Sequence, residues 1–262
     1  MSRATEVRGL STERHMRVLS DGKSIRPGTP SEGGMDRIRA ITFDAFGTIV
    51  DTGQDALIRI SERIVADQRL DVDAVRFLER WDHYFFGIDH DPFLTIAEGT
   101  EASLARAFEE LEVDADPEPY VEMLQREWLR AKAYPEVPAV LEALEGVPRA
   151  VVSNADDAML RDILSKNRLR FDSVVTSEAC RAYKPASAIF EVAIRELGVP
   201  AAAVLHVGDS LEADVGGAKK LGMAAAWVNR TGRPLHPEGA APDLIVRDLA
   251  GLLPALPGLG LA

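Results

Sequence analysis

The sequence has little cysteine, no long apolar run and few basic residues. Cys180 is its single cysteine, which excludes an intrachain disulfide and predicts a reducing cytoplasm. No apolar run approaches the ~20 residues of a membrane-spanning helix, so we expect no membrane partner. Only 30 Lys and Arg stand against 42 Asp and Glu. The net charge of −12 would repel a polyanion, which argues against nucleic acid as a partner.

What the sequence does contain is ordinary for a globular protein of 262 residues, with 46% hydrophobic and 27% charged residues. Such a chain can bury a sizeable core. Residues 1–34 differ from the rest, because they are rich in Arg, Ser, Gly and Pro and carry no sustained apolar period. We predict a disordered N-terminal extension over residues 1–34.

Short apolar runs alternate with helical patterns over residues 35–52 and 134–262. The runs are Ile38–Phe43, Ala150–Val152, "SVVTS", "AVLHVG" and "AAAWVN", with "DLIV" as a sixth. This alternation predicts an α/β core, a Rossmann-like parallel sheet with helices on both faces. Ligands of such sheets bind beyond the carboxyl ends of the strands, and Asp44, Ser153 and Asp209 all fall at such ends.

Residues 53–133 show four helical patterns and no strand pattern. They predict a helical bundle inserted after the first strand, a cap placed to act as a lid over the site. Its aromatic cluster is expected mainly in the bundle core, with one or two members facing the cleft. The cluster comprises Trp81, His83, Tyr84, Phe85 and Phe86.

Four motifs follow one another along the chain. They are "DAFGT" with Asp44, "VVSN" with Ser153, "YKP" with Lys184, and "GDSLEAD" with Asp209 and Asp214. Each lies at the end of a predicted strand or the start of a helix. Together with the helical insert, the motifs over residues 38–227 resemble the haloacid dehalogenase-like hydrolase superfamily, in its branch with a helical cap.

The resemblance implies roles for these residues. Asp44 would be the nucleophile, since a carboxylate can form a covalent intermediate that water then cleaves. Lys184 would neutralise Asp44 and the charge on the transferring group. Small-molecule substrate would be bound by Thr48, Ser153 and Asn154.

The resemblance also implies Mg²⁺, which prefers hard oxygen ligands. Its ligands would be the carboxylates of Asp44 and Asp209 and the backbone carbonyl of Phe46. Asp214 would orient a metal-bound water or Lys184.

Phe46 conflicts with this metal site. Phosphatases of the superfamily usually carry at this position a second Asp that protonates the leaving group, which Phe46 cannot do. The dehalogenases typically carry an aromatic residue there, because halide leaves without a proton. They generally lack an acid equivalent to Asp209, however, and they need an arginine from the cap, for which Arg76 or Arg80 would serve.

The intact acid pair decides the prediction, because two carboxylates converging near Asp44 would be unfavourable without a cation. We predict a Mg²⁺-dependent phosphatase that acts on a small phosphorylated metabolite through an aspartyl-phosphate. The alternative is a 2-haloacid dehalogenase, and a further alternative is a catalytically weak binding or regulatory protein. The sequence leaves the substrate and the oligomeric state open.

Overall fold

The computed structural model describes residues 38–51, 54–88, 91–235 and 239–259. The extension predicted over residues 1–34 lies outside them. No helix of these described ranges combines the length and the apolarity that crossing a bilayer requires.

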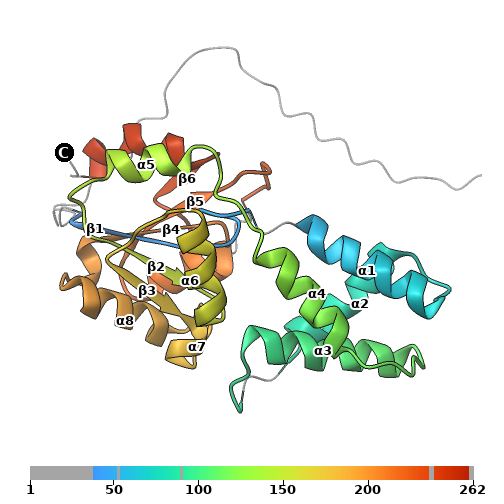
Figure 1. Cartoon of the computed structure of the whole chain (residues 1–262). Coiled ribbons are helices and arrows are strands. Elements are labelled where there is room, and N and C mark those ends of the chain that lie inside the picture. Colours follow the sequence, from blue (N-terminus) through green and yellow to red (C-terminus); the bar gives the residue numbers. More distant parts are fainter. Residues whose placement is uncertain (1–37, 52–53, 89–90, 236–238, 260–262) are drawn as a thin grey trace, which may run out of the picture. The chain divides into compact units, whose positions relative to one another are not determined.

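Six strands of the described residues form one parallel sheet in the order β3-β2-β1-β4-β5-β6 (Figure 1). They are β1 (Ala40–Phe43), β2 (Arg149–Ser153), β3 (Ser173–Thr176), β4 (Val204–Gly208), β5 (Ala224–Val228) and β6 (Leu244–Val246). Apolar residues dominate the strands because helices cover both faces of a parallel sheet. The predicted α/β fold with a Rossmann-like sheet is confirmed.

Alternate apolar residues of β1–β5 enter two different hydrophobic cores. Ile41 and Phe43 pack in the first core and Ala40 in the second. The first core includes residues of α5 (Val137–Ala143), α6 (Asp157–Lys166) and the 3₁₀ segment η3 (Leu249–Leu259). The second includes residues of α8 (Ser187–Leu197), the π-helical turn η2 (Leu211–Gly216) and α9 (Gly217–Lys220). Short helical segments also lie at α7 (Ser177–Cys180) and η1 (Ala201–Ala203).

The first four of the five helices that the described residues form between β1 and β2 make up the α1–α4 bundle (Figure 1). They are α1 (Gln54–Gln68), α2 (Ala74–Phe86), α3 (Ile96–Glu110) and α4 (Glu118–Trp128). Their apolar faces make a third core, and a capping box of Thr95 and Glu98 starts α3. Of the predicted aromatic cluster, Trp81 is buried in this core, whereas Phe86 is 81% exposed.

The start of α3 is hydrogen-bonded to the sheet domain. Asp156, which precedes α6, accepts hydrogen bonds from the backbone N–H groups of Ile96 at 2.7 Å and Ala97 at 2.9 Å. Tyr183 donates from its hydroxyl to the carbonyl of Leu94 at 2.7 Å. The two bonds to Asp156 satisfy N–H groups that a helix leaves free at its first turn. The bond from Tyr183 ties the segment before α3 to the loop that carries Lys184.

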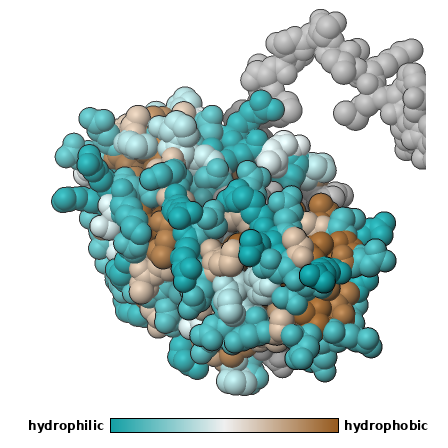
Figure 2. Space-filling view, turned by 45° about the vertical axis from the view of Figure 1, so that its right-hand side comes forward, coloured by the Kyte–Doolittle hydropathy of each residue, from teal (hydrophilic) through white to brown (hydrophobic). Residues whose placement is uncertain are grey.

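Hydrophilic residues predominate on the face shown in Figure 2. Few large apolar side chains of the described ranges are exposed, namely Val75, Phe86, Leu235 and Ile245. Scattered apolar residues of this kind are normal on a protein surface and require no partner.

Candidate active site

Asp44 directly follows β1 and is only 5% exposed. Its backbone N–H donates to the carbonyl of Val207 at 2.8 Å, which fixes it to the neighbouring strand β4. The chain then turns at Gly47, whose φ of +80° favours glycine. A Cβ atom at Gly47 would lie 2.5 Å from an oxygen of Asp209. The turn therefore brings the backbone against a second acid.

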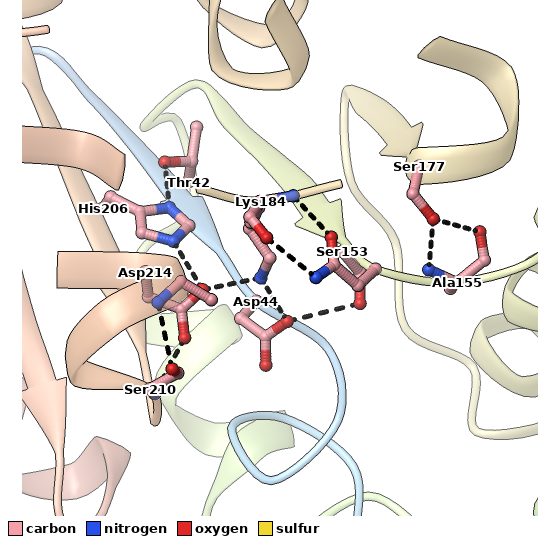
Figure 3. A network of polar contacts seen from close by, with 11 residues as sticks. Thr42, Asp44, Ser153, Ala155, Ser177, Lys184, His206, Ser210 and Asp214 are labelled. Carbon is pink, nitrogen blue, oxygen red and sulfur yellow. Dashed lines mark hydrogen bonds and ion pairs between the residues drawn. The ribbon is translucent and has the colours of Figure 1, made fainter. Parts of the chain in front are cut away.

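Lys184 lies between two carboxylates (Figure 3). Its Nζ is 2.6 Å from Asp44 Oδ1 and 2.6 Å from Asp214 Oδ1, and all three side chains are buried. Burial opposes the charge of Lys184, but the two acids outweigh it and raise its pKa. Burial likewise opposes ionisation of Asp214, but Lys184 and His206 hold its pKa far below the ordinary range. Asp214 is thus neutralised by an ammonium group of the protein itself.

Ser153 and Asn154, at the end of β2, both contact this group. Ser153 donates to Asp44 Oδ1 at 3.2 Å. The Asn154 side chain accepts from the backbone N–H of Lys184 at 2.7 Å and donates to its carbonyl at 3.3 Å. Burial raises the pKa of Asp44, while Lys184 opposes this shift. Asp44 Oδ1 is therefore occupied, and no described residue donates to its Oδ2.

A buried pair on two neighbouring strands, Thr42 and His206, supports Asp214. His206 on β4 lies 3.2 Å from Asp214 through Nε2, and its Nδ1 is 2.8 Å from the hydroxyl of Thr42 on β1 (Figure 3). Thr42 and His206 are register partners across the two strands. The sequence shows one polar residue inside each of the two apolar strands. It does not show that these two residues, 164 positions apart, are hydrogen-bonded to each other.

Asp209 follows β4, and its carboxylate is not bonded by Lys184 as those of Asp44 and Asp214 are. Its backbone carbonyl accepts from Trp227 Nε1 at 2.9 Å and from Arg233 Nη2 at 2.6 Å, whereas its carboxylate accepts no hydrogen bond from the described residues. Burial, together with Asp44 and Asp214, raises the pKa of Asp209 to about 7.

The carboxylates of Asp44, Asp209 and Asp214 offer oxygens that lie within 4.8 Å of one another. Hard oxygens and the unbonded carboxylate of Asp209 fit Mg²⁺. Asp44 and Asp209 would hold the ion, with the carbonyl of Phe46 as predicted, and it would neutralise their charge. Mg²⁺ at this cluster stays a prediction.

A cavity of about 630 Å³ adjoins this cluster. From the sheet domain it is lined by residues that include Phe46, Gly47, Asn154, Asp209, Arg230 and Arg233. From the bundle it is lined by Leu57, Phe85, Ile96 and Trp128. Thr48, predicted to bind substrate, is fully buried and is not a lining residue; its hydroxyl has no hydrogen-bond partner among the described residues.

The two bundle arginines considered for an anion site do not line the cavity. Arg76 pairs with Asp73 at 3.6 Å, and Arg80 pairs with Glu110 at 2.7 Å, both with largely exposed side chains. The arginines that do line it, Arg230 and Arg233, follow β5. These two arginines could not be predicted from the sequence, because a loop arginine carries no periodic signal.

Known relatives share this architecture. Haloacetate dehalogenase H-2 of Moraxella sp. (strain B) is 26% identical over 216 residues, covering 81% of this chain and 95% of the relative. (S)-2-haloacid dehalogenase 4A of Burkholderia cepacia is 28% identical, covering 85% and 96%. The crystal structure of the L-2-haloacid dehalogenase RSc1362 superposes with a TM-score of 0.71 at 26% identity, covering 85% of this chain and 100% of that one.

These comparisons overturn the prediction of a Mg²⁺-dependent phosphatase, because these relatives are named as dehalogenases of haloacids. The prediction assumed that the acids near Asp44 need a metal cation. In the structure Lys184 supplies the positive charge to both Asp44 and Asp214. One member of the predicted acid pair, Asp214, therefore needs no metal, so the pair alone does not decide for phosphoryl transfer, although Asp209 has no such partner.

A family model for haloacid dehalogenase-like hydrolases matches residues 38–222. This match includes β1, the α1–α4 bundle and the strands that carry Asp44, Ser153 and Asp209. The chain therefore belongs to the haloacid dehalogenase-like hydrolases.

Proposed function

We propose that this protein is a 2-haloacid dehalogenase in which Asp44 is the nucleophile. A carboxylate oxygen of Asp44 attacks C2 of the haloacid, the new C–O bond forms, and halide leaves with the electron pair of the C–halogen bond. Water then attacks the carbonyl carbon of the Asp44 ester. This second step releases the 2-hydroxy acid and a proton and regenerates the carboxylate.

The observation that carries the proposal is the asymmetric binding of Asp44. Lys184 and Ser153 both bond Oδ1, so Oδ2 is the oxygen left to attack. During hydrolysis of the ester, negative charge develops on the oxygen of the Asp44 carbonyl. The Lys184 ammonium, already 2.6 Å from Oδ1, would stabilise that charge without reorganising.

Phe46 supports the same reaction. Its side chain borders the cavity at the position two residues after Asp44, where an acid would protonate an alkoxide leaving group. Halide is a weak base and needs no such proton, so an apolar residue there removes nothing from the reaction. An apolar side chain also offers water no hydrogen bond at that position, and exclusion of water would strengthen the electrostatic effect of Lys184.

The test is halide release from 2-chloropropionate, with and without a chelator. We expect turnover that survives the chelator and disappears in Asp44→Asn, whereas the exposed-site control Asp71→Asn stays active. A single turnover in ¹⁸O-labelled water should place the label in the Asp44 carboxylate, detected by mass spectrometry of its peptide. Label found only in the hydroxy acid would mean direct attack by water and would refute the covalent route.

A further inference from the structure

The cavity is much larger than a small haloacid. A haloacetate has five non-hydrogen atoms, and five water molecules would together fill about 150 Å³. The cavity measures about 630 Å³, within the range of sites that hold drug-sized ligands. A small haloacid would therefore leave most of the space to water.

Most of the lining is apolar. Nine of the sixteen lining residues are apolar or aromatic, and Phe85 and Trp128 form part of the wall on the bundle side. Phe46 and Met159 contribute to the lining from the sheet domain. An apolar wall of this kind favours a ligand that buries hydrocarbon, since burial is favourable for each methylene removed from water.

Two arginines among the described residues line the cavity, and they differ in how strongly the protein binds them. Arg230 donates to the carbonyls of Gly47 and Thr48 and pairs with Glu136 at 2.7 Å, so its guanidinium is committed to the protein. Arg233 makes a single side-chain hydrogen bond among the described residues, to the carbonyl of Asp209. A guanidinium with further N–H groups fits a carboxylate.

The turn before Arg233 positions it next to the reacting groups. The Asn229 side chain accepts from the backbone N–H of Arg233 at 2.8 Å and donates to its carbonyl at 2.8 Å. Because Arg233 is bonded to Asp209, its guanidinium lies at the end of the cavity where Asp209 and Gly47 adjoin Asp44. A carboxylate bound there would place C2 of a haloacid near Asp44.

We propose that the substrates are 2-halocarboxylates with a large apolar tail, whose carboxylate binds Arg233 and whose tail packs against Phe85 and Trp128. The inference rests on the proposed dehalogenase function. It also predicts that the cavity binds carboxylates that carry no halogen, which can be tested without any reaction. Octanoate should therefore bind more tightly than propionate, independently of any turnover.

The first experiment compares 2-bromopropionate with 2-bromohexanoate. The three added methylenes should raise kcat/KM by about 60-fold, at about four-fold each. Calorimetric titration with propionate and octanoate reads binding alone. Tight octanoate binding without turnover of any haloacid would refute the proposed dehalogenase function but support the proposed binding site. Turnover without a preference for longer tails would overturn this inference and keep the dehalogenase.

Two pairs of variants locate the two ends of the ligand. Leu57→Phe narrows the cavity and should abolish the preference for the longer tail while sparing 2-bromopropionate; Val75→Phe, on an exposed site of the same bundle, should not. Arg233→Met should raise KM and weaken octanoate binding at least about ten-fold, because it removes a hydrogen bond to a charged group. Arg76→Met is its control. Equal effects of Arg233→Met and Arg76→Met would exclude Arg233 as the anion site.

Discussion

Asp209→Asn should stabilise the protein, although it removes an acid from the site. In the folded state the Asp209 carboxylate accepts no hydrogen bond from the described residues and lies beside Asp44 and Asp214. Its ionisation is therefore opposed by burial and by two like charges, which raise its pKa to about 7 from 3.8. An amide of the same shape removes this repulsion.

The magnitude follows from that pKa difference, which corresponds to about 4 kcal/mol at pH 8. Because the side chain is partly exposed, solvent screens part of the effect, and we expect Asp209→Asn to gain about 2 kcal/mol. The folded-state pKa of this acid is raised, so the destabilisation is complete above pH 7 and fades as the pH falls towards 3.8. Near pH 5 the gain should shrink below about 1 kcal/mol.

Urea unfolding of both proteins at pH 8 and pH 5, in the presence of a chelator, measures the gain. An equal free energy of unfolding for wild type and variant at pH 8 would refute the reasoning about Asp209. A gain that is the same at both pH values would show that packing, rather than ionisation, is its source.

The same experiment with millimolar Mg²⁺ in place of the chelator tests the predicted metal. A ligand that binds the folded state at a hundred times its Kd stabilises it by about 2.7 kcal/mol. If Asp209 is a ligand, Mg²⁺ should stabilise the wild type and not Asp209→Asn. A wild type that is insensitive to Mg²⁺ would make the prediction of a magnesium cofactor wrong.

Three further substitutions test the rest of the site. Asp44→Asn should reduce halide release to background while leaving the circular dichroism spectrum unchanged; residual turnover would point to another nucleophile. Lys184→Met leaves two buried acids facing each other and should lower the free energy of unfolding in urea by about 3–5 kcal/mol; a smaller loss would mean that water enters the site. Asp156→Asn should weaken the attachment of α3 by about 1 kcal/mol and speed backbone hydrogen exchange in its first turn, without affecting exchange in α8.

The fold was predictable because its signals are local. Each strand is an apolar run of a few residues, and parallel strands bring their carboxyl ends to one edge of the sheet. That rule suffices to place Asp44, Ser153 and Asp209 together. The helical patterns of residues 53–133 likewise depend only on neighbouring residues, as α1–α4 illustrate.

The site was less predictable because its contacts join distant segments. The charge balance between Asp214 and Lys184 spans 30 residues and depends on side-chain directions that no periodicity encodes. Because the sequence does not show this balance, it predicts a metal for both acids that follow β4, and the predicted reaction class is wrong. The anion site of the cap was sought at Arg76 and Arg80 on helices, whereas the cavity is bordered by Arg230 and Arg233 on a loop.

The close contact between glycines and acids has a consequence for engineering. A methyl group at Gly208 would lie 2.2 Å from the carboxyl carbon of Asp214, just as one at Gly47 would collide with Asp209. Each acid thus occupies room that its glycine leaves empty. Saturation mutagenesis of Gly208 alone should yield almost no folded clones, because Asp214 is buried. A library that varies Gly47 together with Asp209, which both line the cavity, can explore new shapes of its wall.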